Sequence, residues 1–228
     1  EGKLIIAEIG QNFMGDMELA KKLIRLAKEN GAGLAKFQLY DYKVLYRDHP
    51  LIPDVALSFD QAKMLFNYGA EIGIEVFFSV FDVERVKWCE EIGVKRYKIA
   101  NSVVTDSILL GAIWGTGKPV IISIKWSQEY GLYPQFIEAV KLLVSPKYPA
   151  QTSDYLGYCN PSLGCFMDGI SDHTIGLDAA KIALARGASI IEKHFAIDHQ
   201  TGVDAQWSMT PDELAELVRF NKVVKEIL

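Results

Sequence analysis

Short apolar runs alternate with amphipathic stretches along almost the whole chain. Each apolar run has the length of a β-strand, and each amphipathic stretch has the period of an α-helix. Several helical stretches close with a glycine before the next apolar run, in Asn30-Gly31, Ile72-Gly73, Ile92-Gly93 and Arg186-Gly187. The pattern therefore predicts repeated β-α units.

The same pattern places strands near residues 4–9, 34–39, 75–79, 97–100, 120–124, 155–158, 169–171 and 189–194. Helices are expected at residues 17–29, 58–70, 83–91, 106–114, 134–143, 177–185 and 211–227. The sixth helical position is weak, because residues 160–168 contain Pro161 and Gly164 and suit a loop or a single turn better. Eight strands alternating with helices favour an α/β fold, a (β/α)₈ TIM barrel formed by residues 1–228 as a single domain, over an open doubly wound sheet.

Composition and charge indicate which classes of partner such a barrel binds. The net charge of −5 is mild and the cationic residues are dispersed, which argues against a nucleic acid partner. No apolar run is long enough for a membrane span, and no signal-peptide pattern precedes the first predicted strand. The three cysteines, Cys89, Cys159 and Cys165, lack metal-type spacing and are typical of reduced thiols. We therefore expect a cytoplasmic protein that binds small molecules.

Two histidines, His173 and His194, end apolar runs that lie one β-α-β step apart. The carboxyl ends of neighbouring barrel strands face one cavity, so the two imidazoles are expected to meet there. A lone histidine would be interpreted as a hydrogen-bonded core residue, whereas a pair favours metal ligands or a catalytic pair, and nitrogen ligands suit Mn²⁺, Fe²⁺, Co²⁺ or Zn²⁺. Glu192 and Lys193 are expected to point away from His194, with Glu192 in the barrel wall or supporting the site from behind.

Two lysines, Lys36 and Lys98, lie inside predicted apolar strands, and a buried ammonium group needs an anionic partner. A bound phosphate could supply it, assisted by hydroxyl donors at further strand ends: Ser79, Ser123 and Ser171. The alternative is an internal salt bridge to Glu8 or Glu192. The coincidence of two lysines and three serines favours the anion site. The tryptophans Trp88, Trp114 and Trp207 are expected to be packing residues rather than platforms for ligand stacking.

Several motifs resemble the N-acetylneuraminate (sialic acid) synthase family, which condenses phosphoenolpyruvate with an N-acylhexosamine aldehyde. The resemblance lies in Ile6-Ala7-Glu8-Ile9-Gly10, in Lys36-Phe37-Gln38, and most specifically in Ser171-Asp172-His173-Thr174-Ile175-Gly176 and Glu192-Lys193-His194-Phe195. A tail of single matches follows: Asp198, Gly202, Asp204, Ser208 and Pro211. The similarity extends over nearly the whole chain.

The resemblance implies a transferase that forms a 2-keto sugar acid, with C–O cleavage releasing phosphate. His173 and His194 would hold a divalent metal, most commonly Mn²⁺, with Mg²⁺, Co²⁺ or Zn²⁺ as alternatives, and the metal would polarise the aldehyde. Phosphoenolpyruvate would lie against Lys36, Ser79, Lys98 and Ser171, with Asn101 in place of a family serine. Glu8, Gln38 and Asp204 would orient sugar or water, Glu8 also as a proton-transfer group.

Departures from the family pattern are expected to alter the acceptor side. Phe13 replaces a histidine, Asn101-Ser102-Val103 replaces a Ser-Gly-acid pattern, and Ser123-Ile124-Lys125-Trp126 replaces a small turn. Tyr158-Cys159-Asn160-Pro161 is expected to form the turn after strand six, with Asn160 covering in part for a displaced asparagine. The chain also ends before the family's C-terminal antifreeze-like domain. We therefore expect an unusual aldehyde acceptor.

Other functions are compatible with the same residues. A metal-dependent pyruvate aldolase could use the histidine pair without releasing phosphate. The barrel could also be a non-catalytic relative that binds a phosphorylated ligand. A third alternative is half of a split enzyme, completed by a separate partner that carries the antifreeze-like domain. A homo-oligomer is left open as well.

Overall fold

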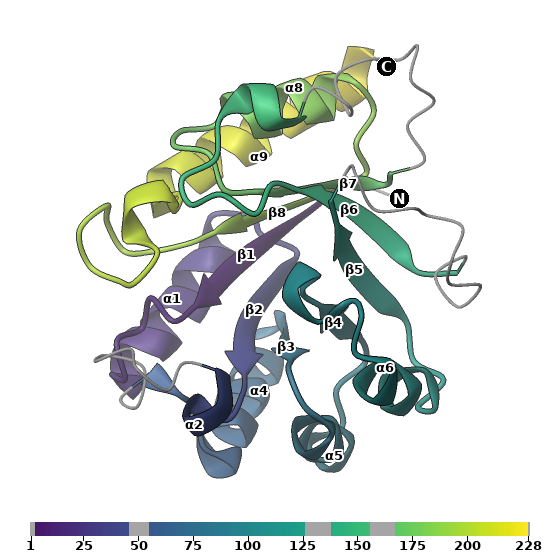
Figure 1. Ribbon diagram of the computed structural model, residues 1–228. Coiled ribbons are helices and arrows are strands. Elements are labelled where there is room, and N and C mark those ends of the chain that lie inside the picture. Colours follow the sequence, from purple (N-terminus) through teal and green to yellow (C-terminus); the bar gives the residue numbers. More distant parts are fainter. Residues whose placement is uncertain (1–2, 46–54, 126–137, 156–166, 228) are drawn as a thin grey trace.

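The computed structural model describes residues 3–45, 55–125, 138–155 and 167–227. Within these ranges, eight parallel strands close into a barrel in the order β1 to β8 (Figure 1). The strands are β1 (Leu4–Gly10), β2 (Leu34–Leu39), β3 (Glu75–Val80), β4 (Tyr97–Ile99), β5 (Val120–Ile124), β6 (Val140–Val144), β7 (Gly169–Asp172) and β8 (Ile190–His194). The predicted (β/α)₈ barrel is confirmed.

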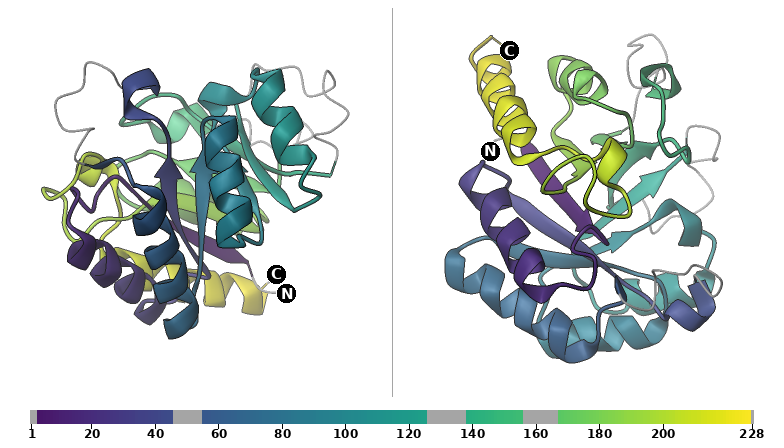
Figure 2. Two further views of the ribbon diagram at one scale, coloured as in Figure 1. Left: turned by 90° about the horizontal axis from the view of Figure 1, so that it is seen from below. Right: turned by 90° about the vertical axis from the view of Figure 1, so that its left-hand side faces the viewer.

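Helices surround the barrel, as the two views of Figure 2 show. They are α1 (Met17–Glu29), α2 (Tyr42–Leu45), α4 (Phe59–Ile72), α5 (Val83–Ile92), α6 (Ser107–Trp114), α8 (Asp178–Ala185) and α9 (Pro211–Ile227). Single 3₁₀ turns are η1 (Asn101–Val103), η3 (Thr152–Tyr155) and η5 (Ala205–Trp207). Within the described part of the chain, no helix has the length and apolar character needed to cross a membrane.

Helix boundaries follow the capping residues in the sequence. The Asp16 side chain accepts hydrogen bonds from the N–H groups of Glu18 and Leu19 at the start of α1. Ser58 and Gln61 form a reciprocal capping box at the start of α4, and Gly73 ends that helix in the left-handed conformation. Local capping explains why α1, α4, α5 and α6 lie close to their predicted positions, whereas the short helix α2 was not predicted.

The sixth strand was placed wrongly from sequence. Residues 140–144, expected at the end of a helix, form β6 and pair with both β5 and β7. Tyr155, expected to begin a strand, lies in η3, and the remainder of that predicted strand is outside the described residues. The run Val-Lys-Leu-Leu-Val suits either structure, and barrel closure decides between them because unpaired edges of β5 and β7 would leave backbone groups without partners.

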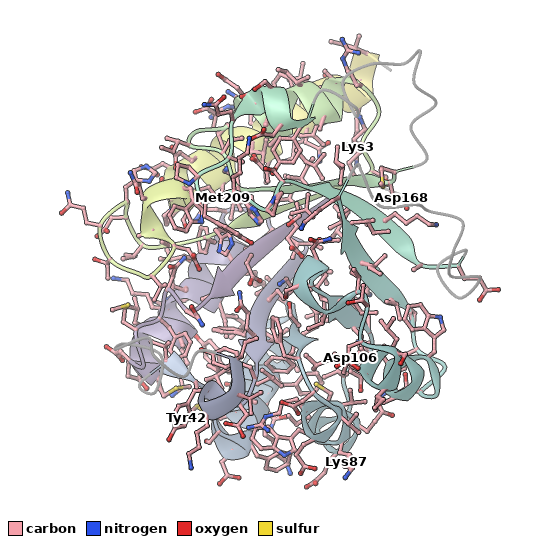
Figure 3. The ribbon with its side chains drawn as sticks, viewed as in Figure 1. Lys3, Tyr42, Lys87, Asp106, Asp168 and Met209 are labelled. Carbon is pink, nitrogen blue, oxygen red and sulfur yellow. The ribbon has the colours of Figure 1, made fainter. Side chains whose placement is uncertain are left out.

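The interior of the barrel is divided into two tiers. Its amino-terminal end is filled by an apolar floor made of Ile6, Leu34, Phe77, Ile121 and Leu142. Two residues further along the same strands, four of the five inward positions are polar: Glu8, Lys36, Ser79 and Ser123. The fifth, on β6, is Val144. Side chains also fill the layer between barrel and helices (Figure 3). The apolar floor leaves the carboxyl end as the place for a polar site.

Candidate active site at the carboxyl end of the barrel

A cavity of about 280 Å³ opens at the carboxyl ends of the strands, and all eight strands contribute to its lining. The lining includes most of the residues predicted from sequence: Glu8, Lys36, Gln38, Ser79, Lys98, Asn101, Ser123, Ser171, His173 and His194. Asp204 lies behind His194, and Asn160 falls outside the described residues. The fold therefore brings together side chains that are far apart in the sequence.

The two buried lysines each bind a serine hydroxyl and lie close to a carboxylate. Lys36 Nζ donates to Ser79 Oγ at 2.7 Å and lies 2.6 Å from Glu8 Oε2. Lys98 Nζ donates to Ser123 Oγ at 2.7 Å. Lys36 therefore forms the predicted salt bridge to Glu8. The serine hydroxyls expected for an anion site also lie beside both lysines. We call Lys36, Ser79, Lys98 and Ser123 the lysine-serine half of the site.

Glu192 lies between the two lysines. Its carboxylate oxygens are 3.6 Å from Lys98 Nζ and 3.8 Å from Lys36 Nζ, and Ser171 Oγ donates to Oε1 at 3.0 Å. The prediction that Glu192 points away from His194 was wrong, because residues two apart on a strand share a face; only Lys193 points away. Burial opposes ionisation of Glu192, but the two lysines outweigh it and lower its pKa.

Lys98 is the less fully compensated ammonium group. Burial is the main cause that lowers its pKa, to about 8, and the positive charge of Lys36 acts in the same direction. Glu192 and Glu8 only partly offset these effects. An added anion in the cavity would stabilise the charged form of Lys98, which is the electrostatic requirement for binding a phosphate or a carboxylate.

His173 is held as a neutral imidazole. Its Nδ1 lies 2.9 Å from the carbonyl oxygen of Ser145, so Nδ1 carries the proton and Nε2 keeps its lone pair. Burial, reinforced by His194, lowers the pKa of His173 to about 3. The Tyr148 ring stacks on the imidazole with the centroids 4.2 Å apart. A neutral, oriented imidazole is the form that binds a metal.

His194 faces His173, with the ring centroids 5.4 Å apart. Its Nδ1 is buried and lies 3.4 Å from Asp204 Oδ2. Asp204 is held in place by Asn12, whose Oδ1 accepts the Asp204 backbone N–H at 2.8 Å. Gly202 passes so close to this asparagine that a Cβ would come within 2.4 Å of Asn12 Oδ1. We call His173, His194, Asp204 and Tyr148 the histidine half of the site.

The imidazole pair fits a divalent metal that accepts two nitrogen ligands and completes its coordination with oxygen donors. In the described ranges, no group of three or more His, Cys, Asp or Glu residues is arranged to hold a metal. Two imidazole ligands would therefore leave most coordination positions for substrate oxygens or water. Both Nδ1 atoms face protein oxygen atoms, that of His173 at 2.9 Å from the Ser145 carbonyl and that of His194 at 3.4 Å from Asp204, so the Nε2 atoms are the ones left for a metal.

Sequence reasoning missed the contribution of β6. The end of that strand supplies Val144, Pro146 and Tyr148 to the cavity lining, in the place expected for the turn around Asn160. The signal was available, because Ser145-Pro146 directly follows an apolar run and proline commonly ends an element. Trp207, expected to be a packing residue, lies near His194 with the ring centroids 6.5 Å apart.

Other predicted residues have structural partners. Gln38 donates to Glu8 Oε1 at 2.9 Å, and Asn101 donates to the Ser123 carbonyl at 3.4 Å. Phe13 is buried and packs edge-on against Phe37, with the ring centroids 5.9 Å apart, so it belongs to the layer outside the barrel. The change at Phe13 therefore does not place an apolar group in the cavity.

Comparison with known proteins gives consistent similarities. A family model described as the NeuB family matches residues 23–228. N-acetylneuraminate-9-phosphate synthase of Mus musculus is 33% identical over 98% of this chain and 70% of that protein. An uncharacterised protein of Methanocaldococcus jannaschii is 32% identical over 100% of this chain and 72% of its own length. A crystal structure of N-acetylneuraminic acid (sialic acid) synthetase from Leptospira borgpetersenii, in complex with citrate, superposes with a TM-score of 0.90 at 28% identity, covering 100% of this chain and 85% of that one.

Proposed function

The chain belongs to the NeuB family, and we propose that it joins phosphoenolpyruvate to a sugar aldehyde, forming a 2-keto sugar acid and releasing phosphate. The family resemblance predicted from the motifs is thereby confirmed. The observation that carries the proposal is the division of one cavity into a lysine-serine half and a histidine half. The first suits an anionic donor, and the second suits a metal near an aldehyde.

The lysine-serine half has the groups that the donor requires. Lys36 and Lys98 are 3% and 2% exposed, so their charges act where water does not screen them. Each ammonium group also holds a serine hydroxyl, which fixes a neutral donor beside each charge. Phosphoenolpyruvate has a phosphate and a carboxylate, and two separate cationic positions would hold both ends and orient the enol carbon.

The histidine half would hold a divalent cation, most simply Mn²⁺, through His173 and His194. A cation bound there would act as a Lewis acid toward the aldehyde oxygen. The hydrogen bond from His173 Nδ1 to Ser145 keeps that imidazole in one tautomer. Asp204 would similarly orient His194 from 3.4 Å.

The reaction would proceed by formation of one carbon–carbon bond. The enol carbon of phosphoenolpyruvate attacks the aldehyde carbon, and the aldehyde oxygen takes up a proton. A water oxygen adds to the donor carbon that carries the phosphate, and the bond between that carbon and the phosphate ester oxygen breaks. The water oxygen becomes the keto oxygen; one water proton balances the proton taken up by the aldehyde oxygen, and the other leaves with inorganic phosphate. Glu8 is placed to exchange a proton with this water or with the sugar, because it lines the cavity beside Lys36 and Gln38.

The acceptor would enter over the mouth residues Asn101, Ser102, Lys125 and Tyr148. Lys125 adds a positive charge at the end of β5, so acceptors with a phosphate group belong in the substrate screen beside neutral hexosamines. The cytoplasmic location and any homo-oligomer or antifreeze-like-domain partner stay predictions from the sequence.

The test is a phosphate-release assay. The protein is incubated with Mn²⁺, phosphoenolpyruvate labelled with ¹⁸O in its bridging position, and a panel of neutral and phosphorylated hexosamines and pentoses. We expect one acceptor to produce phosphate that carries the label, because C–O cleavage leaves the bridging oxygen on phosphorus. Absence of phosphate with every acceptor would contradict the proposal. In a parallel incubation with pyruvate in place of phosphoenolpyruvate, consumption of pyruvate and aldehyde would instead identify an aldolase.

A further inference from the structure

A fully buried ion pair lies directly behind the two histidines, on the outer face of the barrel wall. Lys193 Nζ is 3.1 Å from Asp172 Oδ2, and both side chains are completely inaccessible to solvent. Asp172 and Lys193 are register partners on the adjacent strands β7 and β8. Each residue immediately precedes one of the histidines, so strand alternation turns the pair away from the cavity and the imidazoles toward it.

Both members of the ion pair also hold the backbone of Thr174, the residue directly after His173. Lys193 Nζ donates to the carbonyl oxygen of Thr174 at 2.6 Å. Asp172 Oδ1 accepts the backbone N–H of Thr174 at 2.8 Å. Lys193 directly precedes His194 in the chain. One ammonium group therefore connects the segment that carries His173 with the segment that carries His194.

Each histidine has further anchors of its own. The backbone N–H of His173 donates to Tyr155 Oη at 3.1 Å, and that hydroxyl donates to the Ser171 carbonyl at 2.7 Å. The carbonyl oxygen of His194 accepts the N–H of Met209, a residue labelled in Figure 3, at 2.8 Å. These bonds fix each strand end separately, whereas the Asp172–Lys193 pair joins the two ends through their side chains.

Stability alone is a poor explanation for this arrangement. Removing two charges from water costs several kcal/mol for each ion, and apolar residues of similar volume in place of a buried pair are often neutral or stabilising. The neighbouring outward positions Ile170 and Ile191 are fully buried and apolar, so an apolar pair would suit the same layer. What the ion pair adds is a directional link at one position.

We propose that Asp172 and Lys193 are positioning residues that set the separation and orientation of His173 and His194 for divalent metal binding. The inference rests on the metal site of the proposed function. It predicts that the pair contributes to metal affinity more than to folding. Neither residue is part of the cavity lining.

The experiment compares Mn²⁺ affinity with metal-free stability. Wild-type protein and the double variant Asp172→Leu/Lys193→Met are titrated with Mn²⁺ by calorimetry, and both are unfolded in urea without metal. We expect the Kd for Mn²⁺ to rise about 10- to 100-fold, the range found when groups that orient metal ligands are removed. The urea midpoint should stay near that of wild type. The variant Asp172→Asn/Lys193→Gln, which keeps the hydrogen-bonding groups without the charges, should bind with intermediate affinity.

A matched control removes another ion pair, Glu75–Arg96, which joins the start of β3 to residue 96 with an N–O distance of 2.6 Å. Its variant Glu75→Gln/Arg96→Gln should retain the wild-type Kd. An unchanged Kd in the apolar variant would overturn the inference and leave the metal site standing. If that variant does not fold, an unchanged Kd in Asp172→Asn/Lys193→Gln has the same meaning. Absence of Mn²⁺ binding in wild type would overturn the metal site and the inference together.

Discussion

The two halves of the cavity hold their polar groups in opposite ways. In the lysine-serine half, full charges are buried and compensate one another, with Lys36 2.6 Å from Glu8 and Glu192 between the two lysines. In the histidine half, the cavity-facing imidazole of His173 is kept neutral, and a carbonyl group and an aromatic ring orient it. The lysine-serine half is thus a network of charges, whereas the histidine half presents imidazole nitrogens in a fixed orientation.

Because of this difference, a substitution should affect folding stability in one half of the site more than in the other. Removing one charge from a buried network leaves its partner without compensation, so the folded state is weakened together with ligand binding. Removing a neutral imidazole leaves no stranded charge, so metal binding can be lost at small cost to folding. Variants in the two halves should therefore differ in unfolding free energy even where both lose activity.

The largest effect is expected from Lys36→Met in the lysine-serine half. Glu8 would lose a partner at 2.6 Å, and the unfolding free energy should fall by about 3–5 kcal/mol in urea denaturation. Adding Glu8→Gln should restore part of that stability without restoring phosphate release. A loss below about 1 kcal/mol would mean that the network is not a charged unit.

The corresponding change in the histidine half is His194→Gln. Phosphate release should fall about 100- to 1,000-fold, as when a group that stabilises transition-state charge is removed, while the unfolding free energy changes by about 1 kcal/mol or less. The matched control is His199→Gln, because that histidine is about half exposed and pairs with Glu213. Equal loss of activity in both variants would remove His194 from the site.

A smaller effect is expected from Asp204→Asn. Its carboxylate lies 3.4 Å from His194 Nδ1, and replacing a group that orients a metal ligand commonly weakens affinity about tenfold or more. Mn²⁺ titration measures the change, and the KM for phosphoenolpyruvate should stay close to its wild-type value. A rise in that KM without a change in Mn²⁺ affinity would place Asp204 in the lysine-serine half instead.

The smallest effect concerns pH. Because the pKa of Lys98 is about 8, the free protein loses that positive charge above pH 8, and kcat/KM for phosphoenolpyruvate should be about tenfold lower at pH 9. The unfolded chain keeps this proton up to about pH 10.4, so the Lys98 contribution to stability should rise from pH 8 to that pH. The variant Lys98→Arg stays charged and should abolish this decrease in kcat/KM above pH 8. An unchanged decrease in that variant would assign the titration to another group.

Residues on regular strands were predictable from strand period, whereas Tyr148, which lies beyond the end of β6, was not. Lys36, Ser79, Lys98 and Ser123 follow from strand period alone, because alternation puts them in one tier of the barrel. Glu192 could have been placed by the same period, and its predicted direction was an error in applying it. Tyr148 was missed because its position depends on β6, whose sequence suits a helix as well.

The sequence by itself determined the β-α rhythm, the two histidines at neighbouring strand ends, and the lysines and serines that line the cavity. These features repeat at a short period or a fixed spacing, so they can be recognised within one segment of the sequence. The tertiary structure alone decided that residues 140–144 close the barrel, that Glu192 lies between Lys36 and Lys98, and that Asn12 holds Asp204 near His194. Each of these depends on hydrogen bonds or charges between distant segments, and their free energy exists only once burial brings both partners together.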